Sequence, residues 1–238
     1  MATNPMFPTK ASIEFNYSEL KNVFAGACAP AALARLVERL AAQRVLLVAS
    51  TSLSLATDEF AELQSALGSN FAGLLNGIGP HTPRADVMRT LEAARDADAD
   101  LLVSLGGGSI VDACKVVQLA IDQGVESQAQ LIEYAQYGDG SRGSKYADFS
   151  HFKGDSKIRQ VAIPTTLSGA EFSNNASVLN TEISAKEGYR GIDLCPQTII
   201  YDPQLSLHTP QWLWLSTAIR SLDHAVEGYC SAETHAFL

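Results

Sequence analysis

An apolar strand meets a helix through three consecutive glycines in the stretch Leu101-Leu-Val-Ser-Leu-Gly-Gly-Gly-Ser-Ile-Val-Asp-Ala-Cys-Lys115. Gly106, Gly107 and Gly108 allow backbone torsions that other residues resist, and they leave no side chain in the way of a ligand. A helix that begins near Ser109 points free N–H groups and the positive end of its dipole at an anion. The stretch therefore predicts either a site for nucleotide phosphate or a plain strand-to-helix turn with Ser109 as its cap.

Composition and charge narrow the class of protein. The chain has 238 residues, of which 46% are hydrophobic and 18% charged, so it can bury a substantial core and is too apolar to be disordered. Its net charge of -9 leaves no basic surplus for nucleic acid or an anionic lipid surface. No apolar stretch approaches the roughly 20 residues of a membrane helix. We expect a protein with neither nucleic-acid nor membrane partners.

The spacing of the four cysteines indicates whether the protein belongs in a reducing or an oxidising compartment. Cys28, Cys114, Cys195 and Cys230 are far apart, form no Cys-x-x-Cys pair and follow no secretory signal. We therefore expect reduced thiols in a soluble, cytoplasmic protein.

Apolar, strand-like runs alternate with helical patterns along the chain. The predicted strands are residues 45–49, 101–105 and 160–163. Residues 35–40 are predicted to finish a first helix, and three further helices are predicted over residues 59–67, 86–98 and 110–122. Continuous apolar strands separated by helices predict an α/β fold with a doubly wound, mostly parallel sheet. Such sheets bind ligands beyond the carboxyl ends of their strands. Residues 50–52, 106–109 and 164–166 follow three of these strands and are expected to converge on one crevice.

Two further segments depart from this alternation of strand and helix patterns. Residues 137–157 are rich in glycine, serine and charge without periodicity, which predicts a mobile surface loop that is either a plain insertion or a lid, with the plain insertion favoured. After Pro203 the pattern looks helical throughout. We therefore predict an α/β domain over residues 1–203 and part of a helical domain over residues 204–238.

Four motifs, read in order, resemble the iron-containing (group III) alcohol dehydrogenase family. They are Gly106-Gly-Gly-Ser-Ile-Val-Asp-Ala-Cys-Lys115, Ile163-Pro-Thr-Thr-Leu-Ser-Gly-Ala-Glu171, Ile200-Tyr-Asp-Pro203 and Leu222-Asp-His-Ala-Val-Glu227. The short Thr-Thr-Leu-Ser-Gly-Ala-Glu form and His81-Thr-Pro83 are most similar to the maleylacetate reductase branch. The resemblance implies a dehydroquinate synthase-like N-terminal domain that binds a dinucleotide, followed by a helical domain. It also implies an oxidoreductase that transfers hydride between NAD(P)H and a carbonyl or alcohol.

The resemblance carries cofactor roles onto particular residues. The implied pyrophosphate and hydroxyl contacts come from Gly106, Gly107, Gly108, Ser109, Asp112, Thr165, Thr166 and Ser168. The hydroxyls could instead only cap local turns. Ser50, Thr51 and Ser52 follow the early strand, where an aspartate would bind the adenosine ribose and repel a 2′-phosphate. None of the three is acidic, so both NADP and NAD remain open.

The chain departs from the family pattern at the metal. Metal-dependent relatives carry an aspartate four residues before the histidine of the His-Ala-x-Glu stretch, and Arg220 stands at that position here. A guanidinium has no lone pair for a metal, so we predict a metal-independent site. Arg220 either binds a substrate carboxylate or forms an ion pair with Asp223 or Glu227. His224 is the candidate proton donor.

The second departure is length. The family continues with further helices and two more histidines, whereas this chain stops at Leu238. A partial helical domain leaves apolar surface to cover, so we expect a homo-oligomer or a complex with a second chain. The leading prediction is an NAD(P)H-dependent reductase acting on a small, possibly anionic carbonyl compound such as a keto-acid. The alternative is a truncated member that acts as a partner subunit or performs non-redox biosynthetic chemistry, such as dehydration, cyclisation or decarboxylation.

Overall fold

The computed structural model describes residues 19–56, 58–147 and 156–231. Its main sheet has six strands in the order β1-β9-β6-β4-β2-β3. All the pairings between these strands are parallel. The bounds, in sheet order, are β1 (Asn22–Ala25), β9 (Thr198–Tyr201), β6 (Arg159–Pro164), β4 (Leu101–Gly106), β2 (Val45–Ala49) and β3 (Phe71–Leu75). The predicted mostly parallel sheet is confirmed.

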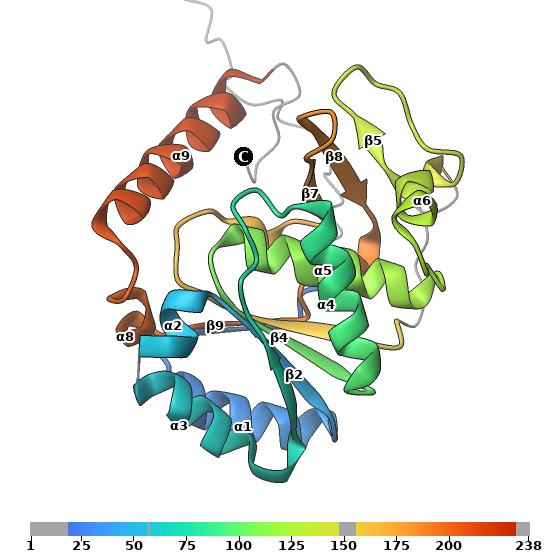
Figure 1. Ribbon diagram of the computed structural model, residues 1–238. Coiled ribbons are helices and arrows are strands. Elements are labelled where there is room, and N and C mark those ends of the chain that lie inside the picture. Colours follow the sequence, from blue (N-terminus) through green and yellow to red (C-terminus); the bar gives the residue numbers. More distant parts are fainter. Residues whose placement is uncertain (1–18, 57, 148–155, 232–238) are drawn as a thin grey trace, which may run out of the picture.

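Helices cover both faces of this sheet (Figure 1). Helices α1 (Ala29–Leu40) and α3 (Asp58–Leu67) lie on one face, and α4 (Arg84–Asp96) and α5 (Gly108–Asp122) on the other. Side chains of β2 alternate between the two cores, because successive residues of a strand point to opposite faces. Leu47 packs with α1 and α3, whereas Leu46 packs with α4 and α5. The fold is therefore doubly wound, as predicted.

The strand order reverses between β2 and β4. The chain runs from β2 outward to β3 and then returns across β2 to β4, and a ligand crevice is expected at the carboxyl ends of such a pair. The short helix α2 (Thr51–Ala56) follows β2 there. The Ser50 N–H donates to the Leu105 carbonyl over 2.9 Å, which joins the ends of β2 and β4. The fold thus brings two of the predicted loops together.

A second, antiparallel sheet was not predicted. Its strands pair in the order β5-β8-β7, and their bounds are β5 (Gln136–Tyr137), β7 (Asn175–Asn180) and β8 (Ala185–Arg190). The helix α6 (Gln128–Leu131) precedes β5. The predicted loop over residues 137–157 therefore begins inside a strand, and residues 148–155 lie outside the described residues.

The end of the described chain is helical, as predicted after Pro203. It forms α8 (Pro203–Ser206) and α9 (Gln211–Cys230), and α9 stands to one side of the sheet in Figure 1. None of the twenty residues of α9, all of which are described, is buried. Its apolar residues recur at alternating spacings of three and four, which is the pattern of a helix that packs against another helix. This apolar stripe is Trp212, Leu215, Ile219, Leu222, Val226 and Tyr229, with 53–76% of each residue exposed.

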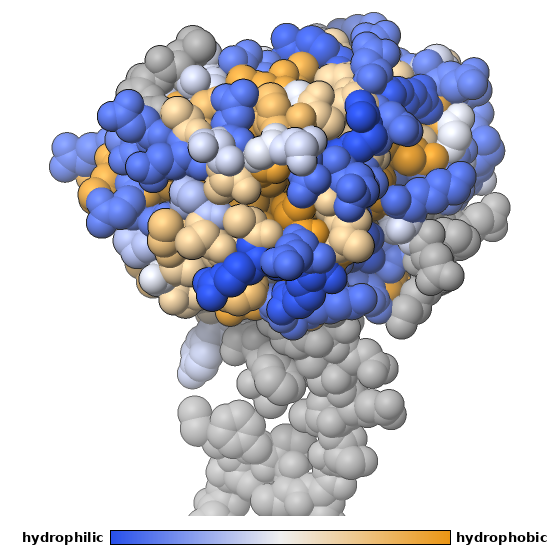
Figure 2. Space-filling view, turned by 90° about the horizontal axis from the view of Figure 1, so that it is seen from below, coloured by the Kyte–Doolittle hydropathy of each residue, from blue (hydrophilic) through white to orange (hydrophobic). Residues whose placement is uncertain are grey.

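The surface on the side of α1 and α3 mixes hydrophilic residues with a hydrophobic area near its centre (Figure 2). In the part of the chain that the structure describes, no helix combines the length and apolarity needed to cross a membrane. All four cysteines lie in the described ranges, and none of them forms a disulfide bond. The division into domains at residue 203 remains a prediction.

Candidate cofactor and substrate site

The N-terminus of α5 is the centre of the candidate site. The helix begins at Gly108 with Gly107 as its N-cap, so the expected start near Ser109 is slightly late and Ser109 is not the cap. The Ser109 hydroxyl instead accepts a hydrogen bond from the His81 N–H at 3.0 Å, and the Ser109 carbonyl accepts one from the Thr82 hydroxyl at 3.0 Å. Because a glycine has no side chain to cap the helix, the first N–H groups of α5 are open to an anion.

The first glycine lies where two loops almost touch. Gly106 has a φ of +147°, which favours glycine, and a Cβ there would lie 2.5 Å from the Ile110 Cδ1 and 3.3 Å from the Ser50 Cβ. The Thr165 N–H donates to the Gly106 carbonyl at 3.0 Å. The loops after β2, β4 and β6 therefore meet at this residue, as the sequence predicted.

The next two glycines lie against the loop after β6. A Cβ on Gly107 would lie 3.2 Å from the Thr166 Cγ2, and one on Gly108 would lie 2.9 Å from the Ser168 Oγ. The Thr166 hydroxyl is buried and has no hydrogen-bond partner among the described residues. An unsatisfied buried hydroxyl costs about 1–3 kcal/mol, so a ligand that accepts its proton would be favoured at this point. These features fit the pyrophosphate of a dinucleotide.

Asp112 and Lys115 lie deeper along α5 and hold the second sheet. The Asp112 carboxylate accepts a hydrogen bond from the Ser177 N–H at 3.0 Å and lies 3.4 Å from the Lys115 Nζ. The Lys115 Nζ is buried and donates to the carbonyls of Ala170 and Asn175 at 2.5 and 2.6 Å. Burial raises the pKa of Asp112 and lowers that of Lys115. Asp112 is thus bound to β7 rather than free for a phosphate contact.

A pocket of about 500 Å³ adjoins the Ser168 side of α5. Its wall combines the C-terminal half of α9 with α5, the loop after β6 and the second sheet. The residues that line it are Asp112, Ser168, Gly169, Ala170, Ser173, Asn175, Ala176, Ser177, Gly188 and His224. The pocket therefore brings His224 together with the predicted cofactor residues Asp112 and Ser168.

Arg220 is not among the residues that line this pocket, although it lies one helical turn before His224. Its Nη1 is paired with the Asp223 carboxylate, and its side chain is 57% exposed. Of the two roles considered for Arg220, the structure shows the ion pair.

Three hydroxyl side chains that the sequence analysis did not single out hold α9 against the β6 loop. The Thr209 hydroxyl donates to the Thr165 carbonyl at 2.6 Å. The Leu167 N–H donates to the Thr217 hydroxyl at 3.2 Å, and the Ser221 hydroxyl donates to the Leu167 carbonyl at 2.6 Å. Thr217 and Ser221 are four residues apart on one helix face, which is the signal that could have identified them. They position the helix that carries His224.

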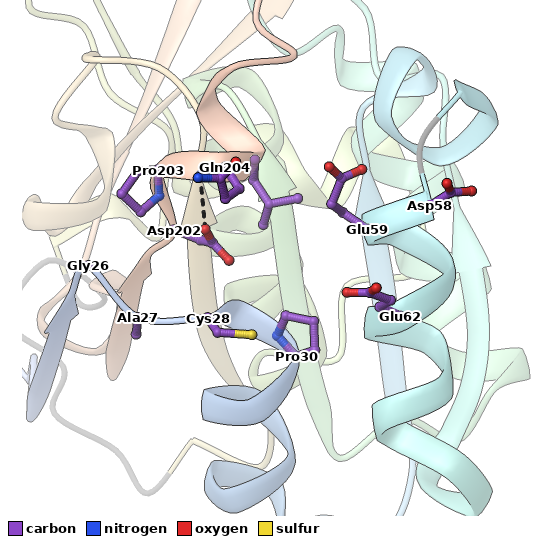
Figure 3. Close-up of a pocket in the computed structure, with 11 residues that line it drawn as sticks. Gly26, Ala27, Cys28, Pro30, Asp58, Glu59, Glu62, Asp202, Pro203 and Gln204 are labelled. Carbon is purple, nitrogen blue, oxygen red and sulfur yellow. Dashed lines mark hydrogen bonds between the residues drawn. The ribbon is translucent and has the colours of Figure 1, made fainter.

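A second pocket, of about 480 Å³, lies at the carboxyl ends of β1 and β9 (Figure 3). The Asp202 carboxylate is already engaged in this pocket, because it accepts hydrogen bonds from the Gln204 N–H at 3.0 Å and the Ala29 N–H at 2.7 Å. The acidic residues that line this pocket are Asp58, Glu59, Glu62 and Asp202. Such a wall repels phosphate, so the crevice at α5 is the better cofactor site.

The described residues do not fit an iron site. No group of three histidine, cysteine, aspartate or glutamate side chains among them is arranged to hold a metal ion. The position at which the resemblance places a ligand aspartate holds Arg220, which cannot donate a lone pair.

Comparison with known proteins shows the class to which this fold and site belong. A sequence profile named iron-containing alcohol dehydrogenase matches residues 21–203. The chain therefore belongs to the iron-containing alcohol dehydrogenase family, a family of oxidoreductases, and the resemblance seen in its motifs is confirmed.

Individual relatives agree with this assignment. The chain is 36% identical over 204 residues to Dehydrogenase FUM7 of Gibberella moniliformis, covering 83% of this chain and 46% of that protein. It is 27% identical over 214 residues to Maleylacetate reductase 1 of Cupriavidus pinatubonensis, covering 90% of this chain and 49% of that protein. The chain spans about half the length of these relatives.

Solved structures share the fold. The maleylacetate reductase of Agrobacterium tumefaciens superposes with a TM-score of 0.69 at 24% identity, over 95% of this chain and 53% of that one. The sulfoacetaldehyde reductase of Bifidobacterium kashiwanohense, solved in complex with NAD+, gives a TM-score of 0.75 at 19% identity, over 92% of this chain and 54% of that one.

Proposed function

We propose that the chain binds NAD(P)H along the crevice at the N-terminus of α5, as part of an enzyme that reduces a carbonyl compound. The observation that carries the proposal is the unpartnered, buried Thr166 hydroxyl beside Gly107, at a helix end that no side chain caps. Helix N–H groups and a hydroxyl donor together suit a pyrophosphate. Membership of an NAD(P)-dependent family supports the same cofactor.

The contacts of the glycines distinguish the two ends of the crevice and so indicate how the cofactor would be oriented in it. Gly106 lies against Ser50, whereas Gly108 lies against Ser168. The pocket that His224 lines adjoins the Ser168 side. The reacting nicotinamide end then belongs at Ser168 and the adenosine end at Ser50.

Within this arrangement the chain supplies binding, orientation and a proton. The cofactor, when bound, supplies the hydride. Thr166 and the first N–H groups of α5 hold the pyrophosphate, and His224 gives a proton to the substrate's carbonyl oxygen. Thr217 and Ser221 keep His224 in place by fixing α9.

The proposed substrate is a small carbonyl compound, with a keto-acid as the first choice. Several relatives are named maleylacetate reductase, which motivates that choice. Arg220 lies one helical turn outside the His224 pocket, and we propose that it leaves Asp223 to bind the carboxylate of a substrate that extends out of the pocket. The proposal includes no metal, since Arg220 cannot ligate one.

Replacement of Thr166 by valine tests this proposal. We expect the variant to bind NADPH about 10–100-fold more weakly, because one hydrogen bond to a charged group contributes about 1.5–3 kcal/mol. We also expect its stability to be unchanged or slightly higher, because valine has the same shape and removes an unsatisfied hydroxyl. Fluorescence titration with NADPH and thermal unfolding measure the two effects.

The parent chain provides the decisive control. If it binds neither NADPH nor NADH, the cofactor proposal is wrong. If the parent chain binds NADPH but does not oxidise it in the presence of any keto-acid tested, the alternative of a partner subunit or non-redox enzyme is favoured.

We also propose an occupant for the apolar stripe of α9. The relatives are about twice as long as the part that the chain matches, and the stripe has the spacing of a helix–helix contact. We propose that helices equivalent to the unmatched half of the relatives cover it.

The 238-residue chain by itself is expected to self-associate through the stripe, because a continuous exposed apolar stripe rarely stays uncovered. Changing Ile219→Lys, Leu222→Glu and Val226→Lys together should yield monomers in analytical ultracentrifugation, whereas Glu227→Lys on the same helix should not. Co-expression with the unmatched half of Dehydrogenase FUM7 should suppress the self-association of the parent. A defined dimer that persists in its presence would instead identify a second copy as the occupant.

A further inference from the structure

Three segments meet at the end of the crevice where Ser50 lies. Gly77 follows β3 with a φ of +80°, and a Cβ built on it would lie 3.7 Å from the Arg89 Nη2 and 4.0 Å from the Thr51 Oγ1. The Arg89 Nη2 also donates to the Gly77 carbonyl at 2.7 Å. The guanidinium of α4 and the first hydroxyl of α2 therefore flank the same glycine at the carboxyl ends of β2 and β3.

Arg89 is held in place while part of its donor set stays available. Its Nη2 lies 3.0 Å from the Asp86 Oδ1, and the other oxygen of Asp86 accepts a hydrogen bond from the Gly79 N–H at 2.8 Å. These contacts and the one to Gly77 all use Nη2, so the Nη1 and Nε donors have no partner among the described residues. The side chain is 47% exposed. A guanidinium that is fixed in this way can still give separate hydrogen bonds from Nη1 and Nε to a phosphate group.

No carboxylate follows β2 to oppose a phosphate there. Ser50, Thr51 and Ser52 are all uncharged, and the hydroxyls of Ser50 and Ser52 lie 3.5 Å apart. The acid that contacts Arg89 is Asp86, and its charge is already paired with Arg89 and the Gly79 N–H. The net potential of this rim therefore does not exclude an additional phosphate.

We propose that Arg89, together with Thr51, binds the 2′-phosphate of NADP(H) and makes the site prefer NADPH over NADH. This inference rests on the proposed function, because it needs the adenosine end of the cofactor to lie at Ser50. A 2′-phosphate carries a charge of about -1.5 to -2 at neutral pH, and NADH has none at that position. Arg89 is therefore a specificity-determining residue rather than part of the reacting centre.

The test compares the dissociation constants of NADPH and NADH in the parent chain and in Arg89→Met. We expect the variant to bind NADPH about 10–100-fold more weakly, as expected for the loss of hydrogen bonds to a charged group, and NADH within about twofold of the parent. Adenosine 2′,5′-bisphosphate should lose affinity like NADPH, whereas 5′-AMP should not. Arg89→Lys, which keeps the positive charge without the planar guanidinium, should bind NADPH with an affinity between those of the parent and Arg89→Met.

The control variant Arg39→Met removes one positive charge from α1, on the far side of the sheet, and should change neither constant. Retained NADH binding shows that Arg89→Met is folded. If Arg89→Met weakens NADPH and NADH equally, or weakens neither, Arg89 does not recognise the 2′-phosphate. If the parent binds neither dinucleotide, the proposed function itself is wrong.

Discussion

Gly107→Asp is expected to weaken NADPH binding at least about 100-fold while leaving the chain folded. The new carboxylate would stand at the N-cap of α5, where the pyrophosphate of the proposed cofactor belongs. Aspartate is a favourable N-cap residue, so the helix itself should not suffer. The loss has two sources, since the carboxylate takes the helix N–H groups and also repels the phosphates. Fluorescence titration measures binding, and circular dichroism measures folding.

The geometry around Gly107 explains why the substitution acts on binding more than on packing. A Cβ there would lie 3.2 Å from the Thr166 Cγ2, a contact that a shift of a few tenths of an ångström relieves. Gly106 would be a poorer choice, since its φ of +147° and the 2.5 Å approach to Ile110 would strain the backbone.

The matched control is Gly138→Asp. It adds the same charge at an exposed glycine with open space around its Cβ, so NADPH binding should not change. If Gly107→Asp bound NADPH as tightly as this control, the N-terminus of α5 would not be the phosphate site.

The sequence predicted those parts of the fold whose apolar pattern lies within one contiguous segment. The strands β2 and β4 are buried on both faces, and such strands can be recognised in a sequence as continuous runs of apolar residues. The meeting of the β2, β4 and β6 loops followed from parallel pairing alone. Here the signals are local, so one sequence suffices.

The second sheet was missed because its burial depends on distant partners. β7 and β8 are short and largely polar, with sequences NASVLN and AKEGYR that lack an apolar run. The lysine that reaches towards β7, Lys115, is 60 residues away from Asn175 in the chain. Charged groups that are buried by tertiary contacts leave no periodic signal, so the wall of the His224 pocket could not be assembled from sequence.

The same limit applies to Arg220 and His224. Their spacing of four residues places them on neighbouring turns, and the sequence analysis gave both a chemical role. The structure gives them different surroundings, because Arg220 pairs with Asp223 whereas His224 lines the pocket and Arg220 does not. A choice between ion pair and ligand contact is decided by small differences in side-chain direction that spacing does not encode.

The second large effect is expected at the ion pair that joins α4 to the second sheet. Glu187 is fully buried and accepts hydrogen bonds from the Arg84 Nη1 at 2.7 Å, the Asn180 Nδ2 at 2.9 Å and the Tyr189 hydroxyl at 3.1 Å. Three donors converge on one carboxylate. Glu187→Gln keeps the shape but turns an amide N–H₂ towards one of these donors and leaves Arg84 buried without its main counter-charge.

We expect Glu187→Gln to lower the free energy of unfolding by about 3 kcal/mol, at the lower end of the cost of breaking a buried ion pair. The lower end applies because Arg84 keeps a contact to Glu182 at 3.4 Å and one to Gln128 at 2.9 Å. Urea denaturation followed by circular dichroism measures the change. Asp223→Asn, which breaks the exposed pair with Arg220, should cost no more than about 0.5 kcal/mol.

The consequence of Glu187→Gln extends to the pocket. β8 pairs with β7 through six residue pairs from Asn175 to Asn180, and β7 supplies the N–H that Asp112 accepts at Ser177. Loosening β8 therefore releases the wall opposite His224, while the glycine turn and the β6 loop, which belong to the parallel sheet, are retained. NADPH should still bind to the variant with nearly the parent's affinity, and keto-acid turnover should fall. Equal losses of both would show that the two sheets act as one unit in holding the cofactor.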